Sequence, residues 1–411
     1  MKTTVSGAPY FMETNPVPSQ FPWLDRSAFC DVAIIGGGVS GAMAAYKFTK
    51  MGVKVALLSE SPVGYCTTAA SQGVASVSLT GGLSGLIANI GTDMAPKVYG
   101  ECEAAVNILE NIINELVPPV PYKRKDSVIY SEDDANAFSE EYQALHHNNF
   151  PAELYHETDA RQKFSFPVKS ALLIPNGAIE CDPYLLTHSL CQNAAAAGAQ
   201  IFENTMITEI VENENEEYVL YSDFGKTVTA KKVVIAAGLE TARQLETETQ
   251  EKVTYSLVTR PVSDFTGWWE EATLCKTGCD NIRLRTTPDR RIIISGLDCG
   301  IAGLKSGIIS PEKMADKKYA ALHTQLMQMF PNIKNIEAEY NYFNEYAFTE
   351  LNLPIVGESE GIYYDLVPAE NGIVFSIIAA DMLIAKYFGN ENDETALFEE
   401  QLYFENISNK A

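Results

Sequence analysis

The sequence predicts an α/β fold in which a Rossmann-like nucleotide-binding domain, assembled from separated pieces of chain, carries an inserted α+β domain with an antiparallel sheet. Three observations predict this fold. A glycine-rich stretch joins a strand to a helix between Asp31 and Leu58. A second strand and helix pattern follows between Pro183 and Gly238. Between Val253 and Ile294, extended runs are broken by Gly, Pro and Asp, as is typical of antiparallel strands.

The first elements form a strand–helix–strand unit. Asp31–Ile35 is a short apolar strand, Val39–Met51 is an alanine-rich helix closed by Gly52, and Val53–Leu58 is the next strand. The residues before this unit are rich in proline and polar side chains and lack an apolar stretch of signal-peptide length. We therefore expect a loosely ordered N-terminal arm.

The later elements repeat the mixed pattern. Thr92–Leu116 has the apolar spacing of a long amphipathic helix, and Pro183–Ala197 is a second helix. Strands are predicted at Gln200–Ile210 and Lys232–Ala236, and the last strong helix at Ile373–Phe388. The predicted arm comprises residues 1–29, the nucleotide-binding domain residues 30–95, 170–250 and 340–411, and the substrate domain residues 96–169 and 251–339.

Composition excludes several classes of function. The 411 residues are 46% hydrophobic, enough for a large core, and carry a formal net charge of −24, which disfavours nucleic acid as a partner. No apolar run reaches the length of a membrane span, so we expect a cytoplasmic protein. Among the 8 cysteines only Cys275 and Cys279 are closely spaced, and without further ligands they predict no metal site.

The glycines of the first unit indicate a dinucleotide. Gly36, Gly38 and Gly41 form a GxGxxG pattern where a strand ends and a helix begins. The first glycine allows the tight turn, the second admits a pyrophosphate close to the backbone, and the third lets helix and strand pack closely. Main-chain N–H groups and the helix dipole would bind the phosphates.

The acid expected to bind the ribose at the end of the second strand is displaced by one position. Ser59 occupies the expected place and Glu60 follows it. Either a small bulge brings Glu60 to the ribose, or Ser59 makes a neutral contact. No arginine lies there to favour a 2′-phosphate, which disfavours NADP.

From Asp31 to Phe398 the chain resembles the D-amino-acid oxidase-like FAD-dependent oxidoreductases, which include glycine and sarcosine oxidases. Beyond the glycine loop, the resemblance rests on five stretches in order: Val63–Ser71, Val233–Gly238, Ile282–Asp289, Leu353–Gly357 and Asn371–Ile373. The resemblance implies FAD as the cofactor and a small amine or amino acid as the substrate. The cofactor-binding residues that it implies are Gly36, Gly38, Val39, Ser40, Gly41, Ser59, Glu60, Thr67, Thr68, Ile207, Ala237, Gly238, Asn371, Gly372 and Ile373.

The chemistry that the resemblance implies is hydride transfer from the carbon beside an amine to the flavin, followed by hydrolysis of the imine. The start of the helix at Ile373, with Asn371 as its cap, would stabilise negative charge on the flavin. Arg283 and Arg285 lie on the matching strand of the substrate domain and share one face, so we expect them to bind a substrate carboxylate.

Several residues depart from the family pattern close to the expected cofactor. Ser59 replaces the usual acid, Cys66 stands where glycine is common, and Val367-Pro368-Ala369-Glu370 replaces a glycine-rich run. These departures leave two alternatives open. One is a catalytically degenerate relative that serves as a binding or scaffold protein, and the other is an NAD-dependent dehydrogenase. The sequence does not predict the oligomeric state.

Overall fold

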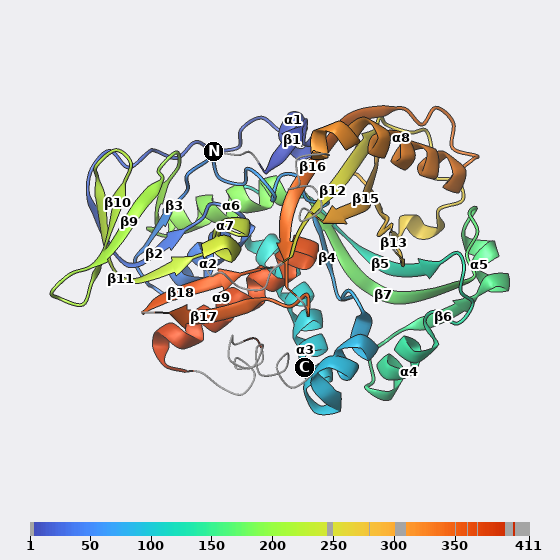
Figure 1. The fold of residues 1–411 in the computed structure, drawn as a ribbon, viewed down its shortest axis with the longest axis horizontal. Coiled ribbons are helices and arrows are strands. Elements are labelled where there is room, and N and C mark those ends of the chain that lie inside the picture. The colour runs from blue at the N-terminus through green and yellow to red at the C-terminus, as the bar shows by residue number, and fades with distance from the viewer. Residues whose placement is uncertain are drawn as a thin grey trace.

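The computed structural model describes residues 4–244, 250–278, 280–300, 310–349, 351–359, 361–367, 369–390 and 398. Two sheets lie side by side along the long axis of the molecule, with helices packed on and between them (Figure 1). This architecture confirms the predicted α/β fold with a second, largely antiparallel sheet. The predictions that concern Cys279 and Pro368 fall outside the described residues.

The first sheet has eight strands and a parallel centre. Its strands run in the spatial order β17 (Ile355–Ser359), β18 (Ile362–Leu366), β11 (Thr227–Ile235), β2 (Ala28–Ile35), β3 (Val55–Leu58) and β8 (Gln200–Phe202), with β10 (Tyr218–Ser222) pairing with β11 and with β9 (Ile207–Glu212). The pairs from β18 to β8 are parallel. Every residue of β3 is buried, as expected for a parallel strand that is covered on both faces.

The second sheet has ten strands. They run in the order β1 (Val5–Gly7), β16 (Ala338–Phe348), β12 (Gln250–Thr259), β15 (Ile292–Gly300), β14 (Arg283–Thr286), β13 (Thr273–Lys276), β5 (Tyr122–Ser131), β7 (Ser170–Cys181) and β4 (Val74–Ser76), with β6 (Glu153–His156) pairing with β7. Neighbours are antiparallel except for β13 and β5. Alternation along the strands gives this sheet one apolar face, which α8 (Pro311–Met329) covers, and one largely polar face.

The remaining helices connect or cover the sheets. They are α1 (Tyr10–Thr14), α2 (Val39–Lys50), α3 (Gly82–Glu115), α4 (Ser139–His147), α5 (Glu157–Lys163), α6 (Pro183–Ala196), α7 (Leu239–Gln244) and α9 (Gly372–Phe388). Helix α6 begins where the sequence predicts, because the carboxylate of Asp182 accepts hydrogen bonds from the N–H groups of Tyr184 and Leu185. Among the described residues, no helix is both long and apolar enough to cross a lipid bilayer.

Membership of the two sheets differs from the predicted domain boundaries. Strands β4, β7 and β16 belong to the ten-stranded sheet, whereas the sequence assigned them to the nucleotide-binding domain. Strand β7 pairs with β5 from Tyr122–Cys181 to Ser131–Ser170, a long-range pairing that local periodicity does not reveal. The chain therefore crosses between the two sheets at other positions than predicted.

The prediction of a loosely ordered N-terminal arm is wrong for the described residues. Strand β1 pairs with β16, and Tyr10 and Phe11 of α1 are buried. The hydroxyl of Tyr10 donates a hydrogen bond to Asp289 across 2.7 Å. The two aromatic rings contact an apolar cluster that includes Ala70, which explains why a proline-rich segment is nevertheless fixed.

Single residues with positive φ mark the start of one predicted element and divide another. The helix predicted at Thr92–Leu116 is the second part of α3, because Gly91 leaves the helical conformation with φ 85°. The strand predicted at Gln200–Ile210 is divided into β8 and β9, and Asn204 between them has φ 49°. Glycine and asparagine tolerate this left-handed conformation better than other residues do.

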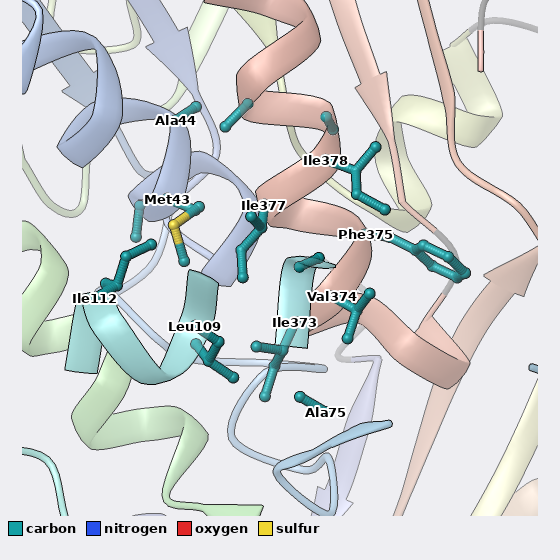
Figure 2. Packing of buried hydrophobic residues seen from close by; sticks show 14 of the residues in the cluster. Met43, Ala44, Ala75, Leu109, Ile112, Ile373, Val374, Phe375, Ile377 and Ile378 are labelled. Carbon is teal, nitrogen blue, oxygen red and sulfur yellow. The ribbon is translucent and has the colours of Figure 1, made fainter. Parts of the chain in front are cut away.

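The main core lies where α9 packs against α2 and α3. Figure 2 shows Met43 of α2 and Leu109 of α3 facing Ile373 and Ile377 of α9, with Ala75 beside the start of α9. The small residues of α2 let α9 approach closely. This core fixes the start of α9 next to β4, at the junction of the two sheets.

Truncation of the core at α9 should destabilise the whole fold. Phe375 is completely buried, so Phe375→Ala should lower the free energy of unfolding by about 3–5 kcal/mol through lost contacts and a cavity. The matched control is Met327→Ala on α8, where the side chain is 52% exposed and the expected change is within about 0.5 kcal/mol. Urea denaturation followed by circular dichroism measures both. Equal losses would contradict the central role of this core.

Candidate active site

The glycine loop is held tightly between the strands of the first sheet. Gly36 has φ 128°, and a Cβ atom on it would overlap the carbonyl group of Ala236, at the end of β11. A Cβ on Gly41 would overlap the carbonyl oxygen of Gly36. Both glycines are therefore required by close backbone packing.

Gly38 has a different role, because its surroundings are open. A Cβ atom on it would contact only the hydroxyl of Thr68, at 3.2 Å, and its φ of −77° suits any residue. Thr68 also accepts a hydrogen bond from the N–H of Val39 across 3.1 Å, at the start of α2. First-turn N–H groups have no acceptor within their own helix, so this end of α2 can bind an anion such as a diphosphate.

The residues at the ends of β3 and β8 are the candidates for a ribose contact. Ser59 is buried against Gly37 and donates a hydrogen bond to the carbonyl oxygen of Ser61 across 2.6 Å, whereas Glu60 is exposed. Sequence reasoning missed Glu203, which follows β8. Its buried carboxylate accepts hydrogen bonds from the N–H groups of Phe21 and Val63 at 3.0 and 2.6 Å. The sequence signal that could have indicated Glu203 is an acidic residue directly after β8, the strand that pairs with β3 in parallel.

Sequence reasoning also missed Asp365, on β18. Its carboxyl group is 1% exposed and accepts a short hydrogen bond from the hydroxyl of Ser40, in the first turn of α2. Burial raises the pKa of Asp365 to about 7, although the Ser40 hydrogen bond acts in the opposite direction. Its second carboxyl oxygen, Oδ1, has no hydrogen-bond partner among the described residues.

Other predicted cofactor residues line the same corner of the fold. The N–H of Ala237 donates to the hydroxyl of Thr241 across 2.8 Å, and Gly238 has φ 59°. Thr67 donates to the carbonyl oxygen of Glu345 across 3.3 Å, which ties the segment after β3 to the ten-stranded sheet. Ile207 is half-buried in the apolar cluster beside β2 and β11.

Cys66, one of the departures from the family pattern, has a conformational explanation. Its φ of 59° lies in the left-handed region that glycine adopts without strain. The backbone therefore keeps the shape for which glycine is commonly used, and only the side chain differs.

The prediction that Asn371 caps the last helix is wrong. Asn371 precedes Gly372, the first residue of α9, but its side chain makes no capping hydrogen bond. Its side-chain amide instead accepts a hydrogen bond from the N–H of Ser76 at 3.1 Å and donates one to the carbonyl oxygen of Ser76 at 2.8 Å. It thus pairs with β4 as the backbone of a neighbouring strand would. The start of α9, with Ile373 buried behind it, is thus anchored to β4.

Arg285 is a buried structural cation in the described chain. Its guanidinium Nη1 donates to the carbonyl oxygens of Gln72, Gly73 and Cys181 at 2.6, 3.0 and 2.9 Å. Its Nε lies 3.8 Å from the carboxylate of Glu180. These contacts join β14 to the two chain segments that flank β4 and α6, so Arg285 holds the site together rather than presenting an unoccupied fork.

Arg283 lies on the same face of the sheet, as predicted, and is engaged differently. Its Nη2 is 2.9 Å from Glu370 and 3.5 Å from Asp298. Burial alone would lower the pKa of Arg283, but these two carboxylates raise it on balance. The hydroxyl of Tyr346 also donates to Asp298, across 3.0 Å. This pair of Arg283 and Glu370 stands directly before the start of α9.

The two adjacent histidines of the sequence, His146 and His147, lie away from this corner. His146 and His147 end α4 and line a cavity of about 840 Å³ between α3 and α4, with Asp93 and Glu140 among its other walls. Within the described ranges, no group of three His, Cys, Asp or Glu side chains is placed to hold a metal ion. The cavity therefore offers no metal site and no contact with the glycine loop.

The residues of the corner fit the FAD that the resemblance implies. Gly38 leaves the start of α2 open to a diphosphate, and the polar face of the ten-stranded sheet lies opposite the segment after β3. Among the described residues, two buried polar atoms on that face have no hydrogen-bond partner, namely Thr254 Oγ1 and Asn344 Oδ1. Such orphaned atoms are typical of a site that a polar ligand completes.

A model of the family described as FAD dependent oxidoreductase matches residues 31–386. The gamma-glutamylputrescine oxidoreductase of Escherichia coli is 20% identical over 384 residues, which cover 91% of this chain and 87% of that protein. A putative Rieske 2Fe-2S iron-sulfur protein of Bacillus subtilis is 26% identical over 216 residues, 52% of this chain and 41% of that protein. The chain thus spans less than half the length of this relative.

Solved structures show the same fold. The crystal structure of glycine oxidase from Geobacillus kaustophilus superposes with a TM-score of 0.73 at 19% sequence identity, and the match covers 89% of this chain and 96% of that chain.

Replacement of Arg285 should reduce stability before it affects any ligand. Arg285→Met removes the Nη1 donor that three carbonyl oxygens share, and of these the Gly73 oxygen keeps the N–H of Cys181, so the free energy of unfolding should fall by about 3 kcal/mol. The matched control is Arg161→Met, whose side chain is 70% exposed and paired with Glu157, with an expected loss of about 0–1 kcal/mol. Denaturant titration compares the two. Wild-type stability in Arg285→Met would contradict the structural role of Arg285 and leave the predicted contact with substrate as the alternative.

Proposed function

The chain belongs to the FAD dependent oxidoreductase family, and on that basis we propose that it oxidises the C–N bond of a small amine or amino acid. Bound FAD supplies the hydride acceptor for the carbon beside the nitrogen. The substrate becomes an imine, and water then hydrolyses the imine to a carbonyl product and ammonia or an amine. The gamma-glutamylputrescine oxidoreductase and glycine oxidase relatives, whose names give substrates with an amino group, support this class of substrate.

The observation that carries the proposal is the meeting of three features at one corner. The open start of α2 can hold a diphosphate, the start of α9 is anchored to β4, and the polar face of the ten-stranded sheet lies beside both. In the proposed complex, Gly38, Val39, Ser40 and Thr68 hold the phosphates, and Gly372 and Ile373 place the start of α9 toward the flavin.

Of the two arginines predicted to bind substrate, we assign only Arg283 to the substrate side. Arg285 is a positioning residue, because its Nη1 donates to three main-chain carbonyl oxygens and its Nε donates to the carbonyl oxygen of Thr286. Arg283 and Glu370 form an ion pair before α9, and such a pair is complementary to a substrate with both charges. The carboxylate of an amino acid would face Arg283 and its ammonium group would face Glu370.

A catalytically degenerate relative that serves as a binding protein is the second candidate. The same ion pair favours it, because Glu370 satisfies Arg283 and so competes with any substrate carboxylate. The two candidates differ in turnover rather than in fold or cofactor.

The visible spectrum separates these candidates when amines are added. We expect the purified protein to be yellow with bound flavin, and a panel of amines and amino acids, mixed without oxygen, to bleach it. An artificial reductant serves as the positive control. A flavin that the reductant bleaches but no amine does would favour the degenerate candidate, and a colourless protein that takes up no FAD would contradict both.

Gly38 provides a test of the phosphate site that leaves the fold intact. Gly38→Val places a branched side chain where the diphosphate approaches, at an ordinary φ, and the Thr68 hydroxyl, 3.2 Å from the new Cβ, has to shift only slightly. FAD affinity should fall by at least 100-fold, about 2.7 kcal/mol, as measured by fluorescence titration. The control is Gly85→Val on α3, where a Cβ meets nothing within 4 Å and FAD affinity should be unchanged. Wild-type FAD affinity in Gly38→Val would place the diphosphate elsewhere.

A further inference from the structure

We propose that Asp365 makes cofactor binding depend on pH, because the site accepts FAD only when this carboxyl group carries its proton. The inference rests on the family's cofactor and does not depend on which substrate is oxidised. Asp365 is not one of the loop glycines, and it is not among the cofactor-binding residues that the sequence predicts.

The carboxyl group of Asp365 lies beside the start of α2. Asp365 accepts a hydrogen bond from Ser40, whose own N–H belongs to the first turn of α2. The first-turn N–H groups are the donors available to a diphosphate. The carboxyl group is therefore one hydrogen bond away from the residues that would hold the phosphates.

The carboxyl group of Asp365 is buried without a charged partner among the described residues. Asp365 is 1% exposed, forms no ion pair with any residue that the structure describes, and leaves Oδ1 without a partner. An isolated buried carboxylate is costly, so the group takes up a proton more readily than an exposed aspartate does. Burial, opposed in part by the Ser40 hydrogen bond, raises the pKa of Asp365 to about 7.

The charged groups on neighbouring elements do not offset this effect. On β11 and α2, the lysines are paired away from the carboxyl group, and Glu240 of α7 is exposed. The pairs are Lys231 with Asp31, Lys232 with Glu358 of β17, Lys47 with Asp381 of α9, and Lys50 with Glu115 of α3. The neighbouring titratable groups also include the rings of Tyr363 and Tyr364 on β18 itself. Burial and the Ser40 hydroxyl remain the influences that act on Asp365.

A bound diphosphate favours the protonated form of Asp365. A charged carboxylate beside the phosphates would be repelled, whereas the protonated group can donate its hydrogen to a phosphate oxygen. Binding then raises the pKa of Asp365 further. Affinity for FAD should be highest below the pKa of the free protein and should fall about tenfold per pH unit above it. Above that pKa, each binding event should take up close to one proton from solution.

The test measures binding and not turnover, so it succeeds or fails separately from the proposed reaction. The full-length chain, freed of FAD, is titrated with FAD by fluorescence at about pH 6 and about pH 8.5. Calorimetry in two buffers with different ionisation enthalpies then counts the protons taken up at the higher pH. For the wild type we expect at least tenfold weaker binding at the higher pH and uptake of about one proton.

Asp365→Asn keeps the shape of the neutral acid without a titrating proton. We expect it to bind FAD equally well at both pH values and to take up no proton. If Asp365→Asn does not fold, Asp365→Ser serves as a second uncharged variant. It should also lose the pH dependence. Asp381→Asn, an exposed aspartate of α9, is the matched control and should keep the wild-type pH dependence.

Three results would overturn the proposal. The first is wild-type affinity that does not change with pH, or no FAD binding at either pH. The second is pH dependence that persists in the uncharged variants. The third is wild-type affinity that increases with pH, because a charged Asp365 would then accept a hydrogen bond from a hydroxyl group of the cofactor.

Discussion

The close contact between the glycine loop and the end of β11 is the constraint on which the site depends. Gly36 allows the β2–α2 corner to pack against the carbonyl group of Ala236, and Gly41 allows α2 to pack against the carbonyl oxygen of Gly36. This contact sets the start of α2 beside β18 and thereby places Ser40 against Asp365. Without it, the first-turn N–H groups would have no fixed position relative to the second sheet.

A small number of polar contacts then fix the chain segments around that corner. Asn371 binds the backbone of Ser76, and Arg285 binds the main chain at Gly73 and Cys181. These contacts are buried, so their hydrogen bonds are made in a medium of low polarity and are costly to break. Side chains that take the place of backbone partners thus complete the site around the glycine loop.

The sequence predicted the parts of the molecule that depend on local pattern. Strand β2, helix α2 and strand β3 follow from apolar spacing and glycine position, and the family match bears out FAD in place of the NAD-dependent alternative. Partners distant in the chain were beyond its reach. Nothing near Asp365 in sequence indicates that it meets Ser40, and Asn371 looks like a helix cap until β4 is placed beside it. The same holds for Arg285, whose three carbonyl partners come from two separate segments.

The pairing of β1 with β16 has a consequence for the behaviour of the protein in concentrated solution. Strand β16 has 11 residues, and without β1 it would offer part of its backbone donors and acceptors to the strands of other molecules. The three residues of β1, held by the buried rings of α1, shield that margin. The N-terminal segment therefore blocks the addition of a strand from another molecule at this edge. Its removal would favour self-association even with every residue of the redox site in place.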